Sequence, residues 1–396
     1  MKRSGWLDSL ASTLPADAVI DHAVRLELSG LDEALFDAWN LGENIVLAWT
    51  QDTIARSFLL IRHYAILEPF DQTLEAAPSD FMHDLLARPK QFGTAEFVAL
   101  VGQFGGQAHV LRVPVRSAVV VAPQIVSGLV RRYSVTLVRN RAVMLLDAVG
   151  FSLHAPLEQV AMLNSLSYSV NSAYRQLISE DVQINFARSS TGDGFYVWNR
   201  ARTPDANIAL YKLMMLVLAD NAVARSKARR FPVPKLRAAF HVGEHYEFCQ
   251  VEALNPTTFS YIVGHVTIEL ARILEHAQPG QILLGDFTIP SRDPATGTVR
   301  NDSTPDFMAR TEGLLRPLEG LAVAGDRIAD IRCYLTGPAT IDGSFEPTRY
   351  LISDKHGRSR PAYNAKINIH LADSEPIYLG LRHTDLHPKS AGSGVA

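Results

Sequence analysis

The hydrophobic pattern divides the chain near residue 133. Before it, residues 31–36 and 81–86 show the apolar spacing of short helices. Residues that interrupt helices and strands divide this region into short segments: Pro69, Pro78, Pro89, Gly93, Gly105 and Gly106. We therefore predict that residues 1–132 form a mainly helical packing or regulatory region, in which we find no catalytic motif.

After residue 133 the pattern alternates between strands and helices. Residues 142–146 are a continuous apolar run, typical of a strand buried on both faces. Long helical patterns cover residues 156–178 and 204–225, with a hairpin between them predicted from strands at 182–186 and 194–198. Further strands are predicted at 236–242, 250–253 and 281–284, and a helix after Gly264.

Loops and β-rich runs follow toward the C-terminus. Residues 291–306 read as an exposed loop. Residues 341–396 hold two β-rich runs and end in ten residues that we expect to be disordered. The predicted organisation is an α+β (α/β sandwich) domain over 133–340, preceded by the helical region and followed by a β-rich extension.

Composition narrows the class of protein. The chain has 396 residues, 47% of them hydrophobic. Its net charge is −3, so it lacks the excess of positive charge that attracts a nucleic-acid backbone. Two cysteines, Cys249 and Cys333, exclude a disulfide scaffold and fit a reducing compartment. The start of the sequence does not read as a secretory signal, and the apolar stretches at 117–130 and 208–223 are too short or too polar to span a bilayer. We expect a cytoplasmic protein without a nucleic-acid partner or membrane span.

Two aspartates carry the candidate chemistry. Asp147 ends the buried strand ahead of a helix, and Asp193 lies in a tight turn between Gly192 and Gly194. Carboxylates at neighbouring strand ends are the oxygen ligands that paired Mg²⁺ or Mn²⁺ ions need when they bridge phosphates. Singly, each residue has a simpler explanation, since Asp is common in turns and as a helix cap.

The order and spacing of four motifs add to this signal. The chain reads LLDAVGFS (145–152), STGDGF (190–195), LRAAFHVGE (236–244) and YIVGHVTIELAR (261–272), the last running into QPGQI (278–282). This series resembles the class III nucleotidyl cyclase catalytic domain over roughly residues 134–340. The resemblance implies a ferredoxin-like fold that acts as a head-to-tail homodimer.

The resemblance also implies the site. Two divalent ions, Mn²⁺ or Mg²⁺, would be held by Asp147, Asp193 and the carbonyl of Ala148, and Arg272 of the other chain would face the triphosphate. Substrate would also contact a short phosphate-binding loop made of Val149, Gly150, Phe151 and Ser152. Arg327 and Arg332 remain open as cations for the triphosphate tail.

Three substrate-facing positions depart from the purine cyclases. The two base-reading positions are Ser189 and Tyr261, and the ribose-orienting Asn is replaced by Ile268. The segment RSSTGDG (188–194) is similar to the pyrimidine cyclases of Pycsar antiphage systems, in which a large side chain, here Arg188, leaves room for a one-ring base. From the neighbouring residues alone, Arg188 is equally consistent with a solvent-exposed residue at a strand end.

The family implies a product and a partner. We expect UTP to be converted to cyclic UMP, which would activate a downstream effector in antiphage defence. Cyclic CMP is the first alternative, because no residue separates uracil from cytosine. A purine cyclase and a catalytically silent nucleotide-sensing domain are the others.

Overall fold

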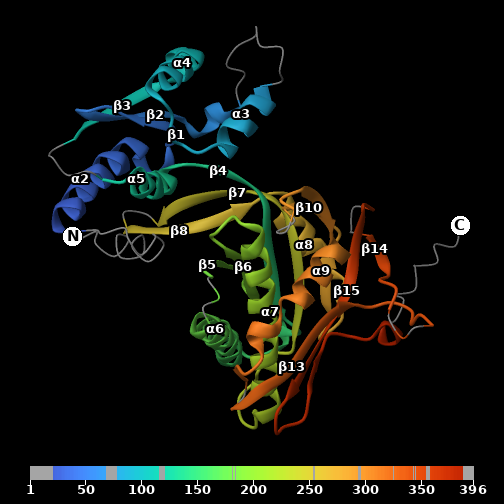
Figure 1. Ribbon diagram of the computed structural model, residues 1–396. Coiled ribbons are helices and arrows are strands. Elements are labelled where there is room, and N and C mark those ends of the chain that lie inside the picture. Colours follow the sequence, from blue (N-terminus) through green and yellow to red (C-terminus); the bar gives the residue numbers. More distant parts are fainter. Residues whose placement is uncertain are drawn as a thin grey trace, which may run out of the picture. The chain divides into compact units, whose positions relative to one another are not determined.

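The computed structural model (Figure 1) describes residues 21–67, 78–115, 121–180, 182, 184–252, 255–292, 296–323, 325–341, 343, 345–353 and 357–386. The chain divides into two compact units, one of residues 1–139 with 245–263 and one of residues 140–244 with 264–396. The predicted disordered tail, residues 387–396, lies outside the described residues.

The first unit is built on a three-stranded antiparallel sheet. Its strands are β1 (Asn44–Gln51), β2 (Ala55–Arg62) and β3 (His109–Pro114), in that order. Helices α2 (His22–Trp39) and α5 (Pro123–Val130) share one apolar core with one face of this sheet, and α3 (Pro78–Ala87) and α4 (Thr94–Phe104) share a second core with the other face. The strand β8 (Asn255–Val263) pairs with the outer part of β7 in the same unit.

The expectation of a mainly helical N-terminal region did not include this sheet, although helices still hold more of the described residues than strands do. β1 and β2 are buried on both faces, so their sequences NIVLAWTQ and ARSFLLIR lack the alternation that marks a half-exposed strand. Their apolar runs are also too short to be told from buried helix by periodicity alone.

The second unit holds a mixed sheet with helices packed on it, which confirms the predicted mixture of helix and sheet (Figure 1). Its strand order is β12-β13-β15-β9-β7-β4-β6-β5. The bounds of these strands are, in chain order, β4 (Thr136–Ala148), β5 (Phe186–Ser190), β6 (Gly194–Asn199), β7 (Leu236–Glu252), β9 (Ile282–Gly285), β12 (Ala322–Val323), β13 (Asp326–Leu335) and β15 (Ser359–Leu371). β14 (Arg349–Ser353) and β16 (Ile377–Leu379) pair with β15.

Two long helices cover one face of this sheet. α6 (Pro156–Ser179) contributes Leu166 and Val170 to a core with Met144, Leu146 and Val197 of the strands. Most residues of α7 (Pro204–Lys227) are buried in the same core. Among the described helices, α7 is the one whose length and composition would allow it to cross a membrane. Because 83% of that window is buried in the structure, α7 is weak evidence for a span.

The described residues after 341 belong to the second unit and are not a separate extension of it. β15 lies inside the sheet, between β13 and β9, and most of its residues are buried. The hairpin strand β5 also begins at Phe186, later than predicted, because residues 186–190 are the ones that pair with β6.

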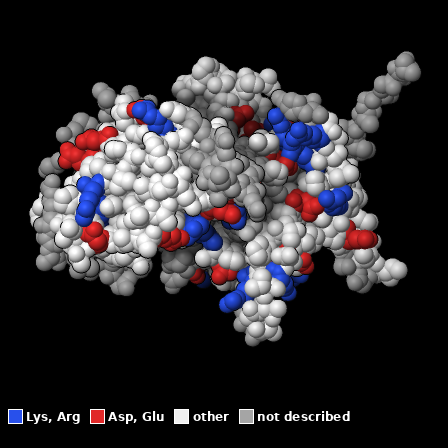
Figure 2. Space-filling model, turned by 90° about the horizontal axis from the view of Figure 1, so that it is seen from above, with Lys and Arg blue, Asp and Glu red and all other residues white. Residues whose placement is uncertain are grey.

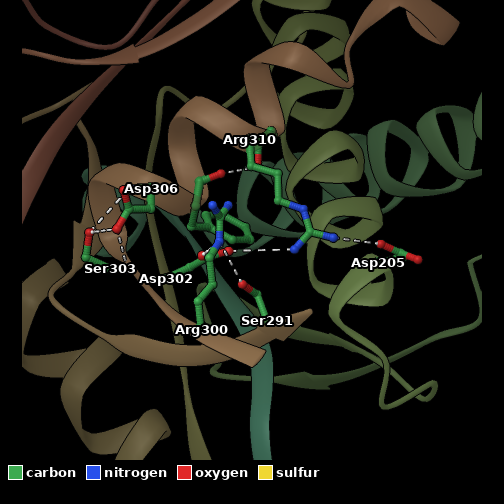
Figure 3. A network of polar contacts seen from close by, with 9 residues as sticks. Asp205, Ser291, Arg300, Asp302, Ser303, Asp306 and Arg310 are labelled. Atoms are coloured by element: carbon green, nitrogen blue, oxygen red, sulfur yellow. Dashed lines mark hydrogen bonds and ion pairs between the residues drawn. The ribbon is translucent and has the colours of Figure 1, made fainter. Parts of the chain in front are cut away.

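Most described residues of the expected loop at 291–306 also belong to strands or a helix. β10 (Thr288–Arg292) and β11 (Val299–Ser303) form a hairpin that leads into α9 (Thr304–Gly313). Figure 3 shows the Asp302 carboxylate with Arg300 and Arg310. Asp302 is buried, and its carboxylate oxygens lie 2.8 Å from Arg300 Nε and 3.6 Å from Arg310 Nη1. Arg310 also contacts Asp205 of α7 at 3.3 Å. This network and the capping box of Ser303 with Asp306 explain why so polar a segment is structured.

Candidate active site

Asp147 lies at the end of β4, on the face of the sheet opposite α6 and α7. Side chains alternate along a strand, and Met144 and Leu146 face the core under the two helices. Asp147 therefore points to the other face, where its residue is 8% exposed. The run of apolar residues before it buries the strand and holds this carboxylate in place.

Asp193 lies in the turn that joins β5 to β6. The Asp193 carbonyl accepts a hydrogen bond of 3.0 Å from the Ala148 N–H, and Asp147 is directly opposite Gly194 in the strand register. The structure thus brings together the two predicted aspartates and the predicted carbonyl-bearing residue Ala148.

Two glycines make this turn possible. Gly192 has φ of +100°, a conformation that favours glycine. A Cβ at Gly194 would lie 1.9 Å from the carbonyl oxygen of Leu146. The close approach of the Asp193 turn to β4 therefore requires glycine at position 194.

Arg237 of β7 neutralises part of this acidic pair. Its Nε donates to Oδ2 of Asp147 at 2.6 Å, and its Nη1 donates to the Ala277 carbonyl at 3.4 Å. Burial raises the pKa of Asp147 above its ordinary value, Arg237 opposes this shift, and the nearby Asp193 carboxylate adds to it. The Asp147 carboxylate is thus partly buried beside a like charge, with one guanidinium against it.

The donor set fits a hard divalent cation. No group of three or more His, Cys, Asp or Glu side chains in the described parts of the chain could hold a metal, so protein ligands here would be the two carboxylates and the Ala148 carbonyl. Mg²⁺ is commonly held by one or two carboxylates, with substrate phosphates and water completing its shell. A like-charged pair that is half withdrawn from water also favours a bound cation.

The predicted phosphate loop follows Asp147 directly. The Val149 N–H donates to the Lys235 carbonyl at 2.9 Å, so it is already used within the sheet. Gly150 has φ of +69° and leads into a short 3₁₀ turn of residues Phe151–Leu153. Ser152 is exposed in that turn, ahead of the N-terminus of α6.

The two neighbouring residues of β5 face opposite sides of the sheet. Ser189 pairs with Tyr196, whose neighbours Phe195 and Val197 pack on the helix-covered core, so Ser189 and Tyr196 share the face of Asp147. Arg188 instead lies on the helix side. Its Nη1 donates to Ser167 of α6 at 2.9 Å, and its guanidinium lies 4.9 Å from the ring centre of Phe195.

The remaining predicted residues lie on other elements. Arg272 and Ile268 are on α8 (His265–Glu275), where Arg272 is bonded to Glu275 at 3.3 Å and Ile268 is 52% exposed. Tyr261 belongs to the first unit, where its ring stacks on Phe248 with centres 6.0 Å apart. Arg332 is on β13 and forms an ion pair with Glu312 of α9. β13 is four strands away from β4, so the two strands lie roughly 19 Å apart across the sheet.

Sequence reasoning missed two residues of this face, Arg237 and Tyr196. A signal for each was available. In LRAAFHVGE the apolar positions 236, 238 and 240 fix one face of β7, which places Arg237 on the other face, beside Asp147. Tyr196 follows from the same alternation in β6.

The charged side chains elsewhere show no single-sign field on the face seen in Figure 2. Lys and Arg side chains there are scattered among Asp and Glu side chains, with broad uncharged areas between them. This distribution agrees with the near-zero net charge of the sequence.

No protein-family model matches the sequence, and a search of curated proteins finds no match. Among solved structures, the chain is similar to the adenylyl cyclase CyaB from P. aeruginosa, with 15% identity, 61% of this chain and 97% of that chain covered, and a TM-score of 0.34. It is also similar to the guanylate cyclase domain of RhGC from Catenaria anguillulae, with 11% identity, 60% and 100% of the two chains covered, and a TM-score of 0.36.

Proposed function

We propose that this chain is a class III nucleotidyl cyclase that converts UTP to 3′,5′-cyclic UMP and pyrophosphate. The observation that carries the proposal is the juxtaposition of Asp147 and Asp193 at the end of β4 and in the adjoining turn. Burial and mutual repulsion of these carboxylates favour a bound divalent cation, and a site of this type acts on phosphates.

The topology around the site supports the proposal. The elements β4-α6-β5-β6-α7-β7 follow one another along the chain, and their strands lie in the order β7-β4-β6-β5. This strand order supports the ferredoxin-like βαββαβ fold that the resemblance implies. The site lies where β4 and the β5–β6 turn meet.

Each residue has a distinct task in the proposed reaction. Asp147, Asp193 and the Ala148 carbonyl would hold the divalent ions, which would supply charge neutralisation and acidify the ribose 3′-hydroxyl. Backbone N–H groups after Gly150 would face the phosphates. The 3′-oxygen attacks the α-phosphorus, its proton passes to solvent, and the bond to the bridging oxygen breaks with release of pyrophosphate.

Arg272 completes the site from a second copy of the chain. In the proposed head-to-tail homodimer, each site combines the aspartates of one chain with α8 of the other. Arg272 would leave Glu275 and contact the triphosphate as charge develops on it.

The choice of a pyrimidine rests on what the base-reading positions lack. Ser189 and Tyr261 replace the charged or polar groups that the resemblance assigns to purine recognition. CTP is the first alternative substrate, followed by a purine nucleotide. The cyclic product would act on a downstream effector, as in the Pycsar systems that the turn sequence resembles, and the protein would work in the cytoplasm.

One experiment tests these statements together. Purified protein is incubated with each ribonucleoside triphosphate and Mn²⁺, and the products are resolved by mass. Cyclic UMP in the wild type and its absence in Asp193→Ala would support the proposal. No cyclic product from any nucleotide would refute it and favour a silent nucleotide-binding domain.

A further inference from the structure

On the face of the sheet that carries Asp147, one bulky side chain lies next to Ser189. Ser189 and Tyr196 are directly opposite each other on β5 and β6, and such pairs have Cβ atoms about 5 Å apart. Leu145 of β4 is opposite Tyr196 on its other side. Tyr196 is therefore the aromatic residue of β6 that lies directly opposite Ser189, between the strand of Asp147 and the strand of Ser189.

Arg188 does not reach this face in the structure. Its guanidinium is held on the helix side by Ser167 and by the ring of Phe195. To face a base beside Ser189, Arg188 would have to give up both contacts and reverse its direction from the strand.

A hydrogen bond links the Tyr196 side chain to α8. Its hydroxyl donates to the carbonyl of Thr267 at 3.1 Å, in the first turn of α8. Burial raises the pKa of Tyr196, so the hydroxyl stays protonated and remains a donor. The ring therefore spans from β6 to the helix that carries Ile268 and Arg272, and it cannot swing away without breaking this bond.

We infer that Tyr196 sets the size of the base in the proposed active site, its ring filling the space beside Ser189 that the second ring of a purine would need. This inference rests on the proposed cyclase function, in which Ser189 lies next to the base. It assigns steric selection to Tyr196 and leaves Arg188 as a structural residue of the helix side.

Three variants separate these roles. Tyr196→Ala removes the ring, Tyr196→Phe keeps the ring and removes the bond to Thr267, and Arg188→Ala is the control on the opposite face. ATP and UTP compete in one reaction with Mn²⁺, and the ratio of their kcat/KM values is measured. We expect Tyr196→Ala to shift this ratio toward ATP by about tenfold or more, and the other two variants to leave it within about twofold.

A binding measurement gives a second readout without turnover. The 3′-deoxy forms of UTP and ATP lack the attacking hydroxyl, so their competition at equilibrium reports only on fit. Tyr196→Ala should gain affinity for 3′-deoxy-ATP relative to 3′-deoxy-UTP. Thermal melting checks that each variant is folded, and Tyr196→Leu, which keeps apolar bulk but no ring, replaces the alanine variant if that variant does not fold.

The outcomes distinguish the inference from the function it rests on. An inactive wild type with all four nucleotides refutes the proposed function. An active wild type that prefers a purine refutes both the pyrimidine substrate and the inference. A preference for UTP that survives loss of the Tyr196 ring refutes the inference alone. A ratio that changes with Arg188→Ala and not with Tyr196→Ala returns base selection to Arg188.

Discussion

Replacing Gly194 with alanine should disable the candidate site by moving its backbone. The added Cβ would lie 1.9 Å from the Leu146 carbonyl oxygen, whereas such contacts are essentially never shorter than 3.0 Å. The turn and β4 must therefore separate by about 1.1 Å, which displaces Asp193 from Asp147 by a similar amount. A displacement of about 1 Å can lower the rate of a positioned reaction by about 10²-fold.

The assay compares cyclic nucleotide formation and thermal unfolding of Gly194→Ala with those of Gly313→Ala. Gly313, at the end of α9, has no heavy atom within 4 Å of its would-be Cβ, so alanine should be tolerated there. We expect Gly194→Ala to lose at least about 10²-fold in rate. Wild-type turnover by a folded Gly194→Ala protein would refute the argument that this close approach builds the site.

The remaining predictions concern charge and pH. Asp193→Ala should abolish cyclisation while the melting temperature holds or rises, because repulsion with Asp147 is relieved. Asp147→Ala should also lose activity. Its free energy of unfolding, measured with urea, should fall by about 1–3 kcal/mol because Arg237 loses its carboxylate partner. Mixing Arg272→Ala with Asp193→Ala subunits should restore part of the activity, since one site of the mixed dimer is intact, and no recovery in proven heterodimers would contradict a shared site. Burial lowers the pKa of His241 from 6.5 to about 4, so the unfolded chain binds more protons than the folded chain between these pH values. The free energy of unfolding should therefore be about 2 kcal/mol lower at pH 5 than above pH 6.5. His241→Asn should remove that pH-dependent part, and equal slopes for the two proteins would contradict it.

The strand that ends at Asp147 was predictable from the sequence because local chemistry specifies it. An unbroken apolar run followed by Asp can only bury the run and leave the carboxylate at its end. Gly192 and Gly194 likewise mark a turn with a left-handed residue and a close contact. The pairing of β4 with β6, which are separated along the chain by α6 and β5, then brings the two carboxylates together.

The position of β15 was not predictable in the same way. Its pairing with β9 and β13 joins residues 282–285 and 328–335 to residues 362–371. No local pattern states which strand becomes an inner neighbour, because that choice depends on which edges remain open after the rest of the sheet has formed. β1 and β2 were missed for another reason, since burial on both faces removes the alternation that identifies a strand.

The contrast between Arg188 and Tyr196 shows where sequence spacing misleads at the level of one residue. Counting back from the Asp193 turn places residue 188 at about the right distance along the strand for a base, but distance along a strand does not fix the face. A shift of one position moves a side chain to the other side of the sheet. Ser189, next along the strand, lies on the face of Asp147, and the bulk beside it comes from Tyr196 of the neighbouring strand. In the proposed site, base selection therefore depends on a pair of residues from two strands, which a motif along one strand does not reveal.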